Sequence, residues 1–139
     1  MATISVDIAQ TLNITCRRGD TFILDLTITN SSGAATNMTG YGGALLVKDS
    51  ANVAVISFFT ATIADRTIDD TYNASNHGLI EMAYGGGSNN VVRFTATAAK
   101  MAALTPGTYS YDFAVQYGSA SENFITTYTK GNFVINADI

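Results

Sequence analysis

The stretch Tyr109-Ser110-Tyr111-Asp112-Phe113-Ala114-Val115-Gln116-Tyr117 decides the fold class, because a bulky apolar residue occupies every second position. Consecutive side chains of a β-strand point to opposite faces of a sheet, so this alternation predicts a strand with one buried and one wet face. Residues 21–29 repeat the pattern, with Phe22, Leu24, Leu26 and Ile28 on one face. We therefore expect the tyrosines and phenylalanine of the first stretch to belong to a core rather than to a stacking platform for sugars or bases.

Further strands are expected wherever short apolar or β-branched stretches lie between turn residues. These are residues 13–16, 43–48, 53–62, 79–84, 91–95 and 124–135, the last with a bulge near Gly131. One segment differs, because residues 97–104 (TAAKMAAL) are strong helix formers that end just before Pro106-Gly107. The sequence therefore predicts an all-β protein, an antiparallel β-sandwich of about eight strands with one short helix at one end.

Length and composition are those of one folded domain. The chain has 139 residues, 47% of them hydrophobic and 13% charged, with a formal net charge of −4. Its seven basic residues are scattered, so we expect no nucleic-acid partner. The longest largely apolar stretch, residues 53–59, is much shorter than the roughly 20 residues of a membrane-spanning helix, so we expect no membrane partner. We expect the sandwich domain to span residues 18–139, with residues 1–17 as a docking arm or a first strand, and residues 62–78 as a long surface loop.

The residues that catalysis requires are scarce. His77 is the only histidine and Cys16 the only cysteine, so a disulfide, a multi-histidine metal site and most nucleophile–base arrangements have no partners. We expect His77 to lie in a loop. The acidic residues that come nearest to a cation site do not follow the alternate ligand spacing of an EF-hand: Asp65, Asp69, Asp70 and Glu81. The sequence therefore predicts no catalytic residues, no cofactor and no metal site, and we expect the protein not to be an enzyme.

Candidate interaction residues lie in turns and on exposed aromatic positions. Arg18-Gly19-Asp20 is the tripeptide that integrins read, although a glycine between two polar residues is also a common turn between strands. Tyr72 and Tyr84 are the aromatic residues that we expect at the surface. The strands carry few lysines and the chain has one proline, so the sheet edges lack the residues that usually prevent pairing with another chain.

The order of several short motifs resembles a known family. An opening Arg-Gly-Asp-Thr-Phe at residues 18–22 precedes Ile-Thr-Asn-Ser-Ser-Gly at 28–33 and Asn-Met-Thr-Gly-Tyr at 37–41. Val91 to Phe94, the TAAKMAAL segment and Pro-Gly-Thr-Tyr-Ser-Tyr-Asp at 106–112 follow, and Gly-Asn-Phe-Val-Ile closes the series at 131–135. From about residue 18 to residue 135 this order is similar to the amino-terminal domain of phage baseplate upper proteins.

The resemblance implies an immunoglobulin-like β-sandwich and a non-enzymatic structural role in a tailed-phage virion. Baseplate upper proteins usually continue into a helical or receptor-binding region, whereas this sequence ends four residues after the last matched position, Ile135. We therefore expect a tail or baseplate adaptor, a head decoration protein or a fibre base rather than a receptor-binding protein. The implied partners are other virion proteins, with a homo-oligomer or a multicopy lattice as the assembly, and the implied location is the virion, after synthesis in the host cytoplasm. The alternative is a carbohydrate- or cell-surface-binding module that uses the exposed aromatics or the Arg18–Asp20 turn.

Overall fold

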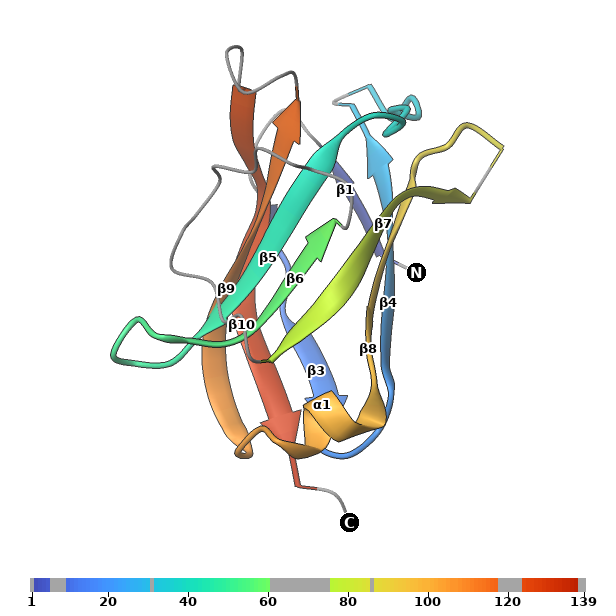
Figure 1. Ribbon diagram of the computed structural model, residues 1–139. Coiled ribbons are helices and arrows are strands. Elements are labelled where there is room, and N and C mark those ends of the chain that lie inside the picture. Colours follow the sequence, from blue (N-terminus) through green and yellow to red (C-terminus); the bar gives the residue numbers. More distant parts are fainter. Residues whose placement is uncertain are drawn as a thin grey trace.

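The computed structural model describes residues 2–5, 10–30, 32–60, 76–85, 87–117 and 124–137. These residues form ten strands and one short helix (Figure 1). The elements are β1 (Ala2–Ser5), β2 (Gln10–Thr11), β3 (Ile14–Arg17), β4 (Phe22–Thr29), β5 (Gly42–Lys48), β6 (Ala54–Thr60), β7 (His77–Gly85), β8 (Val91–Ala96), α1 (Ala98–Ala102), β9 (Gly107–Tyr117) and β10 (Phe124–Asn136). The prediction of an all-β fold with one short helix is confirmed. All eight expected strands are present, and β1 and β2 are additional.

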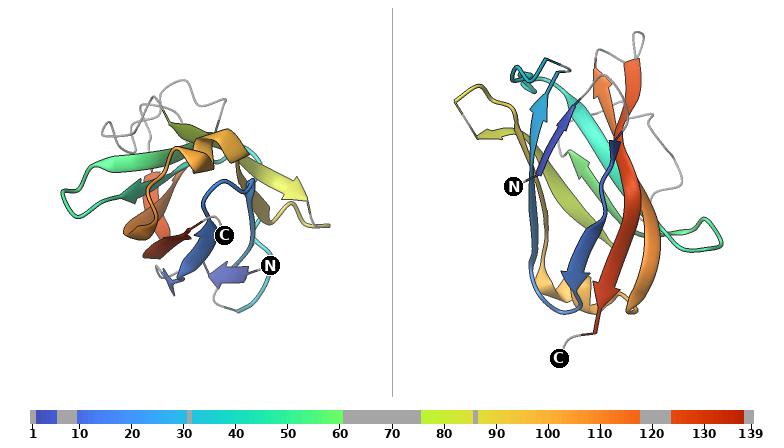
Figure 2. Two further views of the ribbon diagram at one scale, coloured as in Figure 1. Left: turned by 90° about the horizontal axis from the view of Figure 1, so that it is seen from below. Right: turned by 180° about the vertical axis from the view of Figure 1, so that it is seen from behind.

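All ten strands belong to one sheet that curls around a single interior (Figures 1 and 2). The strand order is β1-β4-β8-β7-β6-β5-β9-β10-β2, and β3 pairs with β10 beside β2. Most neighbours are antiparallel, as expected, but β1 with β4, β6 with β7, and β2 and β3 with β10 are parallel pairs. A parallel pair needs a connection of a dozen or more residues, and the stretch between Thr60 and His77 is long enough to return the chain to the same end of the sheet.

The interior is filled by the residues that the alternation placed on the inner face. Tyr111, Phe113 and Val115 of β9 are buried, as are Phe22, Leu26 and Ile28 of β4. Phenylalanine rings connect the two sides of the sheet, with centroid separations of 5.5 Å for Phe22–Phe58, 5.5 Å for Phe22–Phe133, 6.3 Å for Phe58–Phe94 and 4.9 Å for Phe94–Phe113. Tilted and edge-to-face ring pairs at these separations are favourable beyond the area that they bury.

The short helix closes one end of the curled sheet (Figure 2, left). It begins after Thr97, whose hydroxyl accepts a hydrogen bond from the Lys100 amide at 3.3 Å, and it buries Met101 completely. A threonine at this position satisfies one of the amides that a helix N-terminus leaves without an intrahelical partner. The structure therefore confirms the helix predicted within residues 97–104.

Three local expectations are wrong. His77 and Gly78 lie in β7 rather than in a loop, because the strand begins two residues earlier than predicted and His77 pairs with Ser57. The alternation in residues 109–117 predicts Ala114 on the wet face, yet Ala114 is buried, because β9 lies between β5 and β10 and this side chain is small.

The third concerns the bulge in β10, which lies between Thr127 and Thr129 rather than near Gly131. Gly131 has a different role, since a Cβ atom there would lie 2.4 Å from the Leu12 carbonyl oxygen. The rest of the predicted loop, residues 61–75, lies outside the described residues.

The described part of residues 1–17 belongs to the sheet. β1 extends one end of the sheet by pairing with β4, and β2 and β3 extend the other end by pairing with β10. The hydroxyl of buried Tyr111 donates a hydrogen bond to the Leu12 carbonyl, which fastens the segment between β2 and β3 to the core. The docking role considered for this segment stays a prediction.

Candidate interaction surface

The outer surface of β4, β8 and β7 forms a continuous face, which we call the outer face. The strand registers align its residues in rows across the three strands: Ile23, Thr95 and Leu79 form one row, and Asp25, Arg93 and Glu81 form the next. Ile23 is 56% exposed and Leu79 38% exposed. Solvent-exposed apolar residues thus lie next to a row of charged residues, and protein–protein interfaces commonly combine the two.

Arg93 organises the charged row. Its Nε and Nη2 atoms donate to the two carboxylate oxygens of Asp25 at 2.7 and 2.8 Å, and its Nη1 atom donates to the Tyr84 hydroxyl at 2.8 Å. The guanidinium carbon also lies 4.0 Å from the centre of the Tyr84 ring. The paired guanidinium lowers the pKa of Asp25, chiefly through the hydrogen bonds, and the carboxylate raises the pKa of Arg93. The two charges compensate each other, so this row is a preorganised polar patch rather than an anion site.

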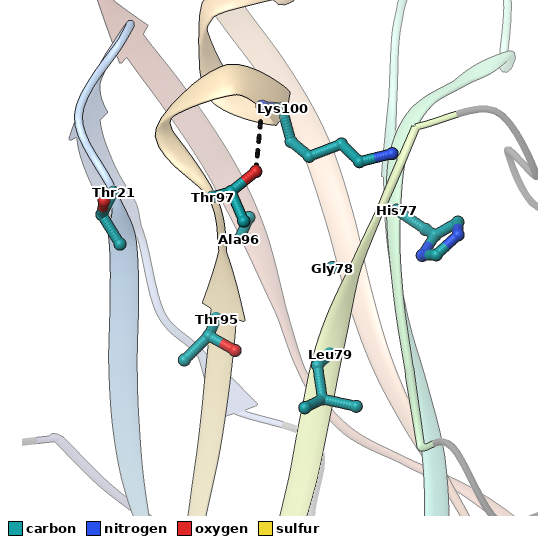
Figure 3. Close-up of a pocket in the computed structure, with 8 residues that line it drawn as sticks. All are labelled: Thr21, His77, Gly78, Leu79, Thr95, Ala96, Thr97 and Lys100. Atoms are coloured by element: carbon teal, nitrogen blue, oxygen red, sulfur yellow. Dashed lines mark hydrogen bonds between the residues drawn. The ribbon is translucent and has the colours of Figure 1, made fainter.

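A pocket of about 410 Å³ lies at the α1 end of the outer face (Figure 3). Its lining residues come from β7, β8, α1 and the residues just before β4 and α1: Thr21, His77, Gly78, Leu79, Thr95, Ala96, Thr97 and Lys100. Lys100 extends from the helix toward β7 at His77, whereas Thr95 and Leu79 project side by side from their strands (Figure 3). None of these lining residues is a carboxylate or a thiol, and the ionisable groups in the pocket wall are the His77 imidazole and the Lys100 amine.

The Arg18-Gly19-Asp20 segment forms the turn between β3 and β4. Gly19 has a φ angle of 86°, a conformation that glycine adopts without steric cost. The Arg18 side chain turns toward the helix, where its Nε donates to the Leu104 carbonyl at 2.9 Å. The Asp20 side chain is exposed, and its Oδ2 atom lies 4.0 Å from the Nη1 atom of Arg17. The turn therefore displays a carboxylate and uses its arginine to hold the carboxyl end of α1.

The other predicted interaction residues are not brought together with this turn. Tyr84 is 46% exposed and contacts Arg93 at the opposite end of the outer face from the pocket, while Tyr72 lies outside the described residues. The Arg93–Asp25 pair could not be predicted from the sequence. Alternation indicates that both side chains face outward, but the register that places them opposite each other joins residues 68 positions apart, and no local pattern carries it.

The catalytic and metal candidates are also dispersed. Cys16 is half-buried on β3, and burial raises its pKa to about 11, so the thiol stays protonated and weakly nucleophilic near neutral pH. His77 lies at the separate pocket on the outer face. Asp65, Asp69 and Asp70 lie outside the described residues, and Glu81 stands opposite Arg93. Across the described ranges, no group of three or more His, Cys, Asp or Glu residues is placed to hold a metal ion, and no helix there is long and apolar enough to cross a membrane.

The fold has a counterpart among solved structures. No protein-family model matches the sequence, and a comparison with curated proteins finds no relative. A solved structure of the N-terminal domain of phage TP901-1 ORF48 is similar in fold, with a TM-score of 0.56 and 9% sequence identity. The match covers 96% of this chain and 94% of that domain. At this identity the likeness concerns the fold, and it extends over almost the whole of both chains.

Proposed function

We propose that this protein is a non-enzymatic structural component of a tailed-phage virion that acts through protein–protein contacts. The observation that carries the proposal is the end-to-end fold similarity to a domain of a phage protein, with coverage above nine-tenths of both chains. The order of motifs between residues 18 and 135 gives independent support, because it depends on the sequence and not on the fold comparison. The immunoglobulin-like classification and a place in the tail or baseplate, rather than on the head, are part of this proposal.

The chemistry of the surface agrees with such a role. The outer face offers exposed Ile23, Leu79 and Tyr84 around an Arg93–Asp25 pair whose two charges compensate each other, so a partner can bury this pair without leaving either charge uncompensated. A virion component repeats each contact many times, so a modest surface is sufficient when many copies act together. The partners are therefore other virion proteins, and the assembly is a homo-oligomer or a multicopy lattice.

The test is to look for the chain in purified phage particles by quantitative mass spectrometry. The expected result is a constant number of copies per particle that survives repeated density-gradient purification. A structural component also remains when the particle is separated into heads and tails, and the fraction that retains it decides between a decoration role and a tail role. Complete absence from purified particles overturns the proposal.

A carbohydrate- or cell-surface-binding module is the second candidate. The pocket of about 410 Å³ beside Leu79 favours it, because small-molecule sites are concave, and the exposed Tyr84 ring offers a separate aromatic surface at the other end of the outer face. Against it, Arg93 already packs on the Tyr84 ring. Glycan-array screening separates the two candidates: specific retention that Tyr84→Ala or Leu79→Asn abolishes supports the module, and a structural subunit gives none.

A further inference from the structure

A groove lies between β3 and β4, which are joined by a tight turn and yet do not pair with each other. In the described part of the chain β3 pairs only with β10, and the first half of β4 pairs only with β8. The groove has a volume of about 260 Å³, and its lining includes Thr15 and Arg17 of β3 and Phe22, Ile23 and Leu24 of β4. Because the pairings around the sheet make β3 and β4 antiparallel, the groove has two strand edges of opposite direction as its walls.

Backbone groups face the groove from both walls. On the β3 side the amides of Leu12 and Arg18 donate to the carbonyl groups of Lys130 and Asn136 in β10. Successive residues of a strand direct their N–H and C=O groups to opposite edges, so the even-numbered residues bond toward β10 and the backbone groups of Thr15 face the groove. On the β4 side the Ile28 amide donates to the Asn90 carbonyl, next to β8. The even-numbered residues of β4 therefore direct their N–H and C=O groups toward β8, and the backbone groups of Ile23 face the groove. Thr15 and Ile23 therefore present N–H and C=O groups across the groove from each other.

β1 already uses the same edge of β4 one step farther along. Its residues pair in parallel with the second half of β4, from Ala2 opposite Leu26 to Ser5 opposite Thr29. Figure 2 (right) shows β1 beside β4 in the upper part of the molecule and β3 beside β10 in the lower part. The groove thus continues the line of β1 past the first half of β4, and a strand placed there would be parallel to β4 and antiparallel to β3.

The β4 side of the groove lacks several of the features that usually prevent strand addition. The residues that border it on β4 are Phe22, Ile23 and Leu24, without a lysine, a proline or a bulge, and Ile23 is 56% exposed. We propose that this groove binds an extended segment of a neighbouring polypeptide, about four residues long, as an additional strand held by main-chain hydrogen bonds to Ile23 and Thr15. Every second side chain of the bound segment would point toward the interior, beside the side chains of Phe22 and Leu24, so these residues of the segment are small and apolar.

The polypeptide nature of the ligand follows from the groove itself, whereas its source, a neighbouring virion subunit, rests on the proposed function. The probe is a synthetic peptide, acetyl-Val-Thr-Val-Thr-Val-amide, added to the full chain while amide hydrogen exchange is followed by NMR. Saturating peptide is expected to slow exchange of the Ile23 and Thr15 amides about tenfold or more, which corresponds to one added hydrogen bond of ordinary strength. The matched control peptide, acetyl-Val-Pro-Val-Pro-Val-amide, lacks two amide donors and is expected to have no effect.

A substitution in the chain gives the reciprocal control. The Ile23 amide faces away from β8, so Ile23→Pro removes a groove donor and leaves the β4–β8 pairing intact, and the Thr15 amide then stays unprotected when peptide is added. Unchanged exchange at both amides with the Val-Thr peptide, or equal protection by the Pro-containing peptide, overturns the groove proposal.

If the free peptide binds too weakly to be detected, the strand can be supplied by the chain itself. The parallel register places Ala2 opposite Leu26, so Val-Thr-Val-Thr inserted between Met1 and Ala2 would extend β1 opposite Phe22–Asp25. This insertion is expected to protect the Ile23 amide and raise the thermal midpoint relative to a Val-Pro-Val-Pro insertion, and equal behaviour of the two insertions counts against the proposal. These outcomes leave the mass-spectrometric test of the particles untouched, so failure of the groove and failure of the virion role are distinguishable.

Discussion

Replacing Tyr111 with phenylalanine tests how strongly the core holds the N-terminal strands. The side chain is 4% exposed, and its hydroxyl donates to the Leu12 carbonyl between β2 and β3 and lies 3.4 Å from the Thr129 hydroxyl. Phenylalanine keeps the ring and its packing but leaves the Leu12 carbonyl without this donor. A buried acceptor that loses its partner costs about 1–3 kcal/mol, and because this carbonyl is only partly buried we expect a loss of about 1–2 kcal/mol.

The matched control lies two residues away on the same strand. The Tyr109 hydroxyl also donates to a main-chain carbonyl, that of Thr105 at 2.6 Å, but this bond lies at the surface, where water replaces a lost donor. Tyr109→Phe should therefore cost less than about 0.5 kcal/mol. Urea unfolding measures both free energies, and for a chain of this size 1 kcal/mol corresponds to about 3–5 °C in Tm. Equal losses for the two variants would refute the reasoning, because burial would then not govern the cost.

Further outcomes follow from the described contacts. Gly78→Ala brings a Cβ atom within 2.5 Å of the Phe58 ring and of the Thr95 carbonyl, so we expect a loss of about 1–3 kcal/mol in urea unfolding, whereas Gly87→Ala, which meets no atom within 4 Å, should be near neutral. Burial raises the Cys16 pKa from 9.0 to about 11, so the stability that this thiol contributes is complete below pH 9 and lost as the pH rises through about 11. The alkaline loss measured by thermal unfolding should shrink in Cys16→Ala. Arg93 lowers the pKa of Asp25 below 3.8, so the contribution of Asp25 is present above that value and disappears as the pH falls through the lowered pKa. In acid titrations followed by circular dichroism, Asp25→Asn should lose less stability than the natural chain, and an unchanged acid transition would count against the pairing.

The local part of the fold could be predicted because it depends on residues that are close together in the sequence. Alternation placed Tyr111, Phe113 and Val115 inside, and the helix was visible from its composition and from the Pro106-Gly107 pair that follows it. The same logic failed at Ala114, since alternation carries no information on whether the second face of a strand is also covered. A first strand was one of two expectations for residues 1–17, but the position of β1 could not be predicted, because four residues without flanking turn signals are too short to show a period.

The non-local part could not be predicted, because pairing registers depend on contacts between distant segments. Asp25 meets Arg93, and Gly131 approaches the Leu12 carbonyl, only because β4 lies beside β8 and the N-terminal segment beside β10. The scarcity of lysine and proline in the strands predicts unprotected sheet edges. The groove between β3 and β4 could not be located from the sequence, since a four-residue turn between two strands ordinarily indicates a paired hairpin.

The N-terminal strands β2 and β3 form one end of the sheet together with the C-terminal strand β10, and this has a consequence for assembly. β2 and β3 pair with β10, so the segments joined lie more than a hundred residues apart, and this end of the sheet forms only when nearly the whole chain is available. Tyr111 then fastens Leu12 to the core, and β3 becomes one wall of the groove that faces Ile23. A strand-binding groove with such a wall exists only in the completed fold. If a neighbouring subunit binds there, it selects folded copies over partly folded ones, which is a useful property in a particle assembled from many copies.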